Sequence, residues 1–156
     1  QQFEYLQNHL RILSAFYGIL KPMDGVTPYR LEMQAKAEIE EKTNLYDYWG
    51  DRLYHSVIDD SRTIINLASK EYSKCIERYL SDKDNYIMIT FCELSGDKLV
   101  TKGTYAKMTR GEMVRFMAEN NIENPVDIQK FDRLGYTFRG NLSSETEYVF
   151  ERKVEK

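Results

Sequence analysis

The stretch Thr63-Ile64-Ile65-Asn66-Leu67-Ala68-Ser69-Lys70 joins a β-branched run to a serine in the position of a helix cap. Isoleucine and threonine favour strands, and a serine just before an apolar-periodic segment favours the start of a helix. After Ser69, apolar side chains recur at helical spacing as far as Leu80. The stretch therefore predicts a strand that passes directly into a helix.

Downstream of this unit, the sequence predicts a β-hairpin and then a helix. Residues 86–94 alternate and are rich in β-forming residues, the turn Ser95-Gly96-Asp97 follows, and residues 99–108 run back. Thr109-Arg110-Gly111-Glu112 has the S/T-x-x-E form of a capping box, which predicts that the next helix begins there.

The last third of the chain carries signals for a short helix and two strands. Asn124-Pro125 predicts the start of a helix that reaches Phe131. Residues 135–139 and 146–153 have the pattern of strands, and residues 140–144 read as the turn between them.

Upstream of residue 63, helical patterns prevail. Apolar residues from Phe3 to Leu20 fall on one helical stripe, which Pro22 is expected to end. No capping residue precedes this stripe, so we expect the chain to be the C-terminal part of a longer protein. Residues 26–33 favour an extended or irregular segment.

Two more helices are predicted before the strand at residue 63. Residues 34–42 form a polar stretch with helical character. Leu45, Trp49, Leu53 and Val57 then recur every four residues, which predicts one continuous helix.

Length and composition place the chain in an ordinary globular class. With 156 residues, 42% of them apolar and 13% aromatic, residues 1–156 are expected to form a single domain with its own core. No internal repeat or linker interrupts the chain. We predict an α+β (mixed α/β) fold in which several helices surround a mixed sheet.

The charge balance limits the possible partners. The 22 basic and 25 acidic residues give a net charge of −3, so any contact with nucleic acid must use a local basic patch. No apolar run is long enough to cross a bilayer, and no signal peptide opens the chain. We therefore expect a cytoplasmic protein that does not engage a membrane.

The sequence predicts neither a metal site nor a cofactor. His9, His55, Cys75 and Cys92 do not fall into any ligand spacing typical of zinc, and two reduced thiols are expected. Gly-x-Gly-x-x-Gly, phosphate-binding Gly-Lys-Ser/Thr and Gly-x-Ser-x-Gly motifs are absent, which removes only the easily recognised enzyme classes.

One candidate site lies where the predicted strand meets its helix. Asn66, Ser69 and Lys70 stand at this junction, and a helix N-terminus after a strand favours an anionic ligand. The alternative is an ordinary helix cap.

A second candidate is the pair Arg30 and Glu32. In an extended segment these side chains point the same way, because direction alternates with period two. They could form a plain ion pair, or Arg30 could hold an anionic group while Glu32 moves a proton.

A third candidate is a local excess of three positive charges between residues 97 and 115. Lysine and arginine beside an aromatic residue suit a phosphate backbone with a stacked base. Alternatively the cations could be an ordinary solvated face, in which Arg115 pairs with Glu119. The group comprises Lys98, Lys102, Tyr105, Lys107, Arg110 and Arg115, against Asp97 and Glu112.

Five segments together resemble the bacterial YaaA family and occur in that family's order. They are Leu-Arg-Ile-Leu-Ser-Ala-Phe-Tyr-Gly-Ile-Leu-Lys-Pro-Met-Asp (10–24), Pro-Tyr-Arg-Leu-Glu-Met (28–33), Leu-Tyr-Asp-Tyr-Trp-Gly-Asp (45–51), Asn-Leu-Ala-Ser-Lys-Glu-Tyr (66–72) and Tyr-Ala-Lys-Met-Thr-Arg-Gly-Glu-Met-Val-Arg-Phe (105–116). The sequence Gly135-Tyr136-Thr137-Phe138, with Phe150 and Arg152, agrees with it as well.

The resemblance implies a protein of the peroxide-stress response that binds double-stranded DNA through a positively charged cleft. Lys107-Met108-Thr109-Arg110-Gly111 departs from the family pattern, because one of two adjacent lysines is replaced. The family's helix-hairpin-helix element and its N-terminal Ser-Pro-Ala-Lys sequence have no counterpart among these residues. DNA binding could therefore also need sequence outside this chain.

Three functional hypotheses follow. The first is a DNA-binding protein in which Lys107, Arg110 and Arg115 contact phosphates. The second is an enzyme acting on a nucleobase or nucleotide, with Glu32 as acid or base and Arg30, Asn66 and Lys70 as binding groups. The third is an iron-handling or partner-binding module, in which carboxylates would hold iron weakly.

Overall fold

The computed structural model describes residues 1–95 and 98–153. The chain divides into two compact units. The first comprises Gln1–Phe3, Ile65–Leu67 and Tyr86–Lys156, and the second comprises Glu4–Ile64 and Ala68–Asn85. None of the helices in the described part of the chain is long and apolar enough to span a bilayer.

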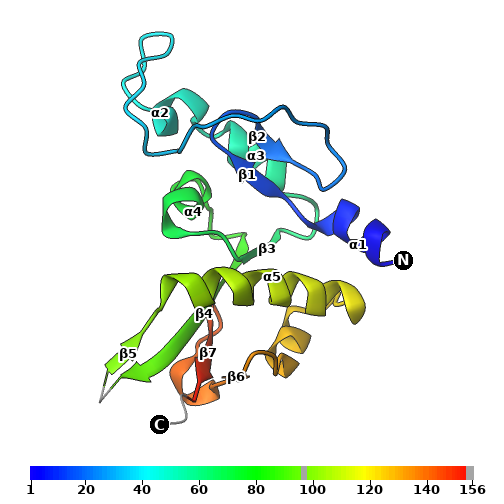
Figure 1. Ribbon diagram of the computed structural model, residues 1–156. Helices are drawn as coiled ribbons and strands as arrows, with labels where there is room; N and C mark the ends of the chain where they lie inside the picture. Colours follow the sequence, from blue (N-terminus) through cyan, green and yellow to red (C-terminus); the bar gives the residue numbers. More distant parts are fainter. Residues whose placement is uncertain (96–97, 154–156) are drawn as a thin grey trace. The chain divides into compact units, whose positions relative to one another are not determined.

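A five-stranded mixed sheet organises the first unit (Figure 1). Its strand order is β3-β4-β7-β6, and β5 pairs with β4 off this path. β4 and β7 are parallel, whereas the β4/β5 and β6/β7 pairs are antiparallel. The α+β class predicted from the sequence is confirmed. The strands are β3 (Thr63–Asn66), β4 (Asn85–Ser95), β5 (Lys98–Val100), β6 (Tyr136–Phe138) and β7 (Glu147–Arg152).

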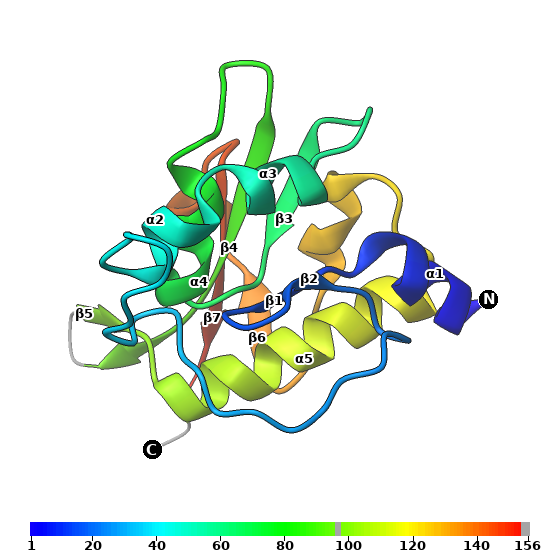
Figure 2. The same cartoon turned by 90° about the horizontal axis from the view of Figure 1, so that it is seen from above.

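Helix α5 (Gly103–Glu119) crosses one face of this sheet, as Figures 1 and 2 show. Its buried residues Met113 and Phe116 join a core with alternate residues of β4, among them Ile89 and Phe91. Alternation places every second strand residue on one face, so this pattern is what a strand under a helix requires. Phe91, Phe131 and Phe150 lie with ring centroids 5.6–5.9 Å apart at the centre of the core.

The predictions for the last third of the chain are largely confirmed. The predicted short helix is a 3₁₀ helix, η1 (Pro125–Lys130), and the Asn124 side chain accepts a hydrogen bond from the Val126 amide. β6 and β7 lie where the two strands were expected, and a second 3₁₀ helix, η2 (Gly140–Leu142), occupies the predicted turn.

The first strand of the hairpin predicted from residue 86 is confirmed, but the predicted second strand is longer than the observed one. β5 ends at Val100, and α5 begins at Gly103 instead of at the predicted capping box. Thr109 lies inside the helix, where its hydroxyl donates to the Tyr105 carbonyl one turn earlier. The hydroxyl is thus satisfied without a cap. Of the predicted turn, Gly96 and Asp97 lie outside the described residues.

The long N-terminal helix predicted for residues 3–20 is wrong. Helix α1 (Gln2–His9) is short, and a hairpin of β1 (Ile12–Ser14) and β2 (Gly18–Leu20) follows it. The Ser14 hydroxyl accepts hydrogen bonds from the backbone amides of Phe16 and Tyr17. These bonds form a local turn that competes with a helix. Gly18 completes the turn at φ 81°, where an added Cβ would lie 2.9 Å from the Trp49 ring.

The irregular segment expected at residues 26–33 is confirmed, but the polar helix predicted for 34–42 is absent. Ile39 and Lys42 form an isolated bridge around Glu40 and Glu41, which both have positive φ. A polar stretch without an apolar face has little to bury as a helix, so a local turn prevails here.

The second unit gathers three short helices around its own core. The helix predicted across residues 45–57 is broken into α2 (Leu45–Trp49) and α3 (Arg52–Val57) by Gly50 at φ 56°. Asn44 caps α2, because its side chain accepts a hydrogen bond from the backbone amide of Asp47. The predicted strand-to-helix unit is confirmed as β3 and α4 (Lys70–Glu77), whose Cys75 and Ile76 are buried.

Candidate functional site

The basic group predicted for residues 98–115 lies mostly on helix α5. Ala106, Thr109, Met113 and Phe116 point inward at helical spacing, which leaves the intervening residues outside. Lys107 and Arg110 are three residues apart on this outer surface and are therefore neighbours. Lys107 is exposed and Arg110 is half-buried.

Arg110 is unusual among the cations of this helix. Burial lowers its pKa, and no nearby carboxylate offsets that effect. Among the described residues, neither Lys107 nor Arg110 forms an ion pair. A guanidinium that is partly removed from water without an acidic partner would be stabilised by an anion bound from outside.

Arg115 has a different environment, although it belongs to the same predicted group. Its Nε lies 2.7 Å from Glu119 Oε1, so the predicted i,i+4 pair is confirmed. Arg133 also pairs with Glu119, at 2.5 Å, and with Glu112 at 3.4 Å. Arg133 and then Arg115 lower the pKa of Glu119. Arg115 thus belongs to a balanced network, named here the Arg115–Glu119–Arg133 network.

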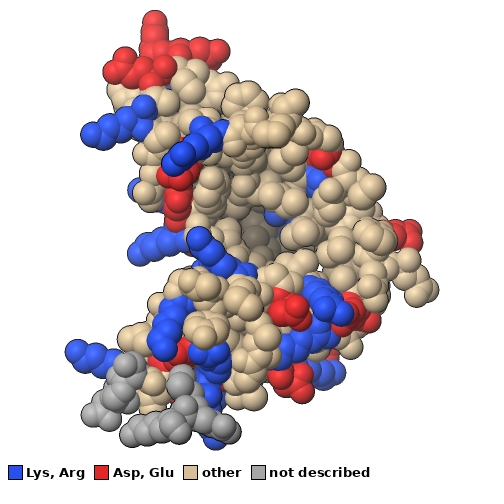
Figure 3. Space-filling model, in the orientation of Figure 1, with Lys and Arg blue, Asp and Glu red and all other residues tan. Residues whose placement is uncertain are grey.

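Figure 3 shows this division of charge on the unit that carries α5. Acidic and basic side chains lie side by side over the C-terminal end of the helix, whereas basic side chains prevail over its N-terminal end. On the face shown, basic side chains therefore prevail only at one end of the helix.

Beside the start of α5, a buried carboxylate organises two further cations. Glu93, at the end of β4, is 1% exposed and lies 2.5 Å from Arg152 and 2.8 Å from Lys102. Lys102 and then Arg152 lower the pKa of Glu93 against the opposing effect of burial. The Arg152 guanidinium covers the Tyr105 ring at 3.8 Å. Tyr105 is therefore held in place by a cation that is itself paired.

Sequence reasoning missed Glu93 and Arg152 as members of this cluster. A signal for Glu93 was available, because Ile87, Ile89, Phe91 and Glu93 have the same parity in an alternating strand and all are buried. A glutamate in an apolar row predicts a buried partner of opposite charge.

The strand-to-helix junction holds the second group. Ser69 occupies the N-cap of α4 but makes no side-chain cap bond, and Lys70 is exposed. Asn66 falls in the first unit, whereas Ser69 and Lys70 fall in the second. The role of these three residues as an anion site stays a prediction.

Arg30 and Glu32 have the alternation expected of an extended segment. Both are exposed, while Leu31 is half-buried and Met33 is fully buried. Within the described chain they do not pair with each other. The backbone amide of Gln34 donates a hydrogen bond to Glu71 Oε1 at 3.2 Å, which fixes the end of this segment against α4. Whether Glu32 acts as an acid or base stays a prediction.

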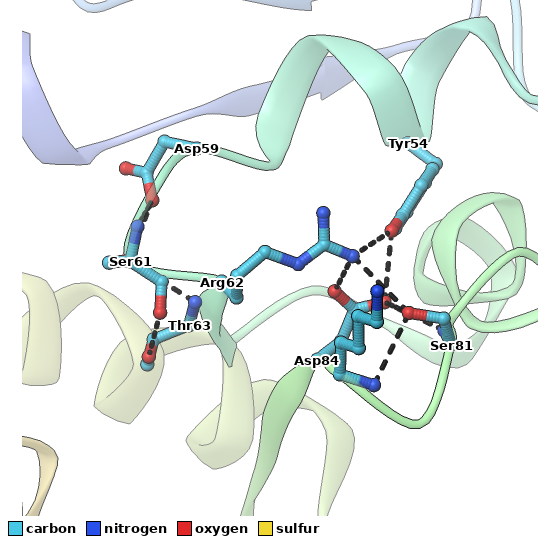
Figure 4. Close-up of polar contacts among 8 residues, drawn as sticks. Tyr54, Asp59, Ser61, Arg62, Thr63, Ser81 and Asp84 are labelled. Carbon is cyan, nitrogen blue, oxygen red and sulfur yellow. Dashed lines mark hydrogen bonds and ion pairs between the residues drawn. The ribbon is translucent and has the colours of Figure 1, made fainter.

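A polar cluster that the sequence did not reveal lies in the second unit (Figure 4). The Asp84 side chain is inaccessible to solvent and lies 2.5 Å from Arg62. It also accepts hydrogen bonds from the Tyr54 hydroxyl at 2.9 Å and the Ser81 amide at 2.7 Å. The Ser81 amide is the main cause of a lowered pKa at Asp84. The cluster fastens the loop before β4.

The thiols are not suited to reaction with peroxide. Burial raises the pKa of Cys75 to about 11 and also raises the pKa of Cys92, and both side chains are buried. The thiolate is the reactive form, so both cysteines are held in their unreactive state. In the described residues, no group of three or more His, Cys, Asp or Glu could hold a metal ion.

The fold and these side chains define an α+β chain with a basic helix surface next to paired structural charges. A model of the family described as peroxide stress protein YaaA matches residues 1–142. The chain belongs to this family.

Bacterial relatives agree with this assignment. A UPF0246 protein of Agathobacter rectalis is 78% identical over 153 residues, which are 98% of this chain and 61% of that protein. UPF0246 proteins of Lachnoclostridium phytofermentans and Desulfitobacterium hafniense are 56% and 54% identical over 96% and 97% of the chain, and over 58% and 61% of their own lengths. The chain thus spans about three fifths of the relatives it matches.

Proposed function

We propose that this protein acts in the peroxide response by binding double-stranded DNA, and that the middle of α5 supplies the phosphate contacts. The observation that carries the proposal is the pair Lys107 and Arg110, which are adjacent on the helix and lack an ion-pair partner among the described residues. Every phosphate oxygen is an acceptor, and phosphate contacts by lysine and arginine supply most of non-specific DNA affinity.

The helix backbone next to Arg110 supports the same proposal. Gly111 lies inside α5, where glycine is unfavourable by about 1 kcal/mol relative to alanine. A Cβ added there would meet no atom within 4 Å, so packing inside the protein does not require glycine. A helix surface without a side chain lets a ligand backbone come close to the Arg110 guanidinium.

Arg115 is assigned a smaller role than Lys107 and Arg110. Glu119 and Glu112 already balance its charge, and a phosphate would have to compete with them. Tyr105 is exposed and could offer its uncovered face to a sugar or base at the edge of the contact.

The test is duplex-DNA binding by fluorescence anisotropy across a salt series from about 50 to 200 mM, the range in which phosphate contacts change affinity strongly. Lys107→Ala with Arg110→Ala is expected to lower affinity about tenfold at the lowest salt and to flatten the log–log salt slope by about two. Arg115→Ala is the matched control, because it removes one cation from the same helix and should change affinity less than twofold.

Two results would overturn the proposal. One is a folded double variant that binds the duplex as the unmodified protein does at every salt concentration. The other is an Arg115→Ala variant that loses as much affinity as the double variant, since the paired and unpaired cations would then be equivalent.

A further inference from the structure

An exposed cluster of three aromatic rings lies in the second unit, apart from any role assigned above. Phe16 and Tyr29 stack with ring centroids 5.3 Å apart and an interplanar angle of 29°. Tyr17 meets both rings edge-on, at 4.9 Å from Phe16 and 5.6 Å from Tyr29. Phe16 is 56% exposed and Tyr29 is 42% exposed, so aromatic surface faces solvent. These three residues are named here the aromatic platform.

The aromatic platform is held in place by hydrogen bonds beneath it. The Ser14 and Tyr29 hydroxyls lie 2.5 Å apart, and the same Ser14 oxygen accepts the Phe16 and Tyr17 amides at 3.2 and 2.9 Å. Tyr17 is also held in place, because its hydroxyl oxygen accepts a hydrogen bond from the backbone amide of Thr27 at 3.0 Å. Rings that are already ordered lose little conformational entropy when a flat ligand stacks on them.

The charge around the aromatic platform favours an anionic partner. Between residues 10 and 32 the chain has three basic residues, Arg11, Lys21 and Arg30, and two acidic residues, Asp24 and Glu32. The Asp24 carboxylate is engaged by the Lys21 amide at 2.8 Å. Arg30 directly follows Tyr29 and is exposed. An exposed aromatic surface with adjacent guanidinium and ammonium groups suits a base attached to a phosphate backbone.

We propose that the aromatic platform stacks an unpaired nucleobase on Phe16, with Arg30 near the adjoining phosphate. This inference rests on the proposed DNA binding and adds that the bound nucleic acid has a single-stranded or unpaired part. A base inside an intact duplex is stacked on its neighbours and does not present a free face.

The experiment measures binding of a mixed-sequence single-stranded oligonucleotide that contains 2-aminopurine, beside the matching duplex. Phe16→Ala is expected to lower single-strand affinity by about fivefold or more, and to reduce the change in 2-aminopurine fluorescence on binding. Phe16→Trp keeps a flat ring and should retain both. Phe3→Ala is the matched control, because Phe3 is an 80% exposed phenylalanine outside the platform. All variants are compared by circular dichroism and thermal melting.

Three results would overturn the proposal. One is a Phe16→Ala variant that binds the single strand as well as Phe3→Ala does, and another is a Phe16→Ala variant that loses duplex and single-strand affinity equally. In either case, retention of the Lys107 and Arg110 effect on the duplex would leave the proposed function intact. If the unmodified protein binds neither form of DNA, both proposals are wrong.

Discussion

The two halves of helix α5 carry similar side chains in different surroundings. Arg115, in the second half, faces Glu119 and Glu112 and shares them with Arg133. Arg110 lies about one and a half turns earlier and Lys107 about two turns earlier. Neither faces a carboxylate among the described residues, and burial lowers the pKa of Arg110. A count of charges treats all three as one basic patch. The presence or absence of an ion-pair partner distinguishes Arg115, which stabilises the fold, from Lys107 and Arg110, which remain available to a ligand.

The start of the helix extends this comparison. Lys102 and Arg152 are close to the helix N-terminus, but both are paired with Glu93. The available cations are thus confined between two paired clusters.

The largest effect is expected for Glu93→Gln. The substitution keeps the size of the side chain but leaves Arg152 and Lys102 without their carboxylate. Loss of one partner of a fully buried pair costs about 3–5 kcal/mol, and we expect about 2 kcal/mol because Lys102 is 52% exposed. Urea unfolding followed by circular dichroism measures the change, and Glu145→Gln, on an exposed loop residue, is the control. An unchanged midpoint would mean that Glu93 is not a structural partner.

The same pairs predict how stability depends on pH. The folded state has lowered pKa values at Glu93 and Asp84, so the stabilisation is fully present above the unfolded values of about 4 and is lost as pH falls through the folded values. Thermal melting between pH 7 and pH 3 should therefore show a falling midpoint below about pH 4. Glu93→Gln should flatten this fall, and an equally steep fall in the variant would contradict the assignment.

A smaller effect of opposite sign is expected for Gly111→Ala. Alanine should stabilise α5 by about 0.5–1 kcal/mol, because it restricts the unfolded chain and meets no atom in the folded one. If a DNA backbone passes close to Arg110, the added methyl should also weaken duplex binding by a few-fold. Melting and anisotropy on the same sample separate the two effects. Higher stability with unchanged affinity would place the DNA away from Gly111.

No effect is expected at the cysteines. Both thiols are buried with raised pKa values, so hydrogen peroxide at neutral pH should leave them reduced in the folded protein. Mass spectrometry after peroxide treatment, with a urea-unfolded sample as the positive control, measures the oxidation. Rapid oxidation of Cys75 in the folded state would indicate a direct thiol reaction with peroxide in place of DNA binding.

The sequence predicted the parts of the fold that local patterns determine. The strand at residue 63, its helix and the long strand β4 follow from β-branched runs and alternation. The predicted helix over residues 3–20 failed because its apolar spacing also fits two short strands, and the Ser14 turn decided between them. The single-domain prediction is not tested by the division into two compact units and stays a prediction.

The candidate site was predictable in its residues but not in their relations. Lys107, Arg110 and Arg115 were all expected from sequence, and the pair Arg115–Glu119 was foreseen from i,i+4 spacing. Sequence spacing could not predict the ion pairs of Arg133 and Glu93. Arg133 pairs with Glu119, 14 residues away, and Glu93 pairs with Lys102, 9 residues away. These residues come together only through the packing of the sheet and helix. Long-range pairing of this kind depends on tertiary structure.

The most direct test of the central claim compares Arg110→Gln with Arg115→Gln in duplex-DNA affinity and thermal melting. The account predicts that Arg110→Gln loses several-fold affinity at low salt with an equal or higher melting midpoint, since it removes a half-buried charge without an acidic partner. Arg115→Gln should keep its affinity and melt slightly earlier. The reverse pattern, with binding lost at Arg115 and stability lost at Arg110, would contradict the assignment of the two halves of α5.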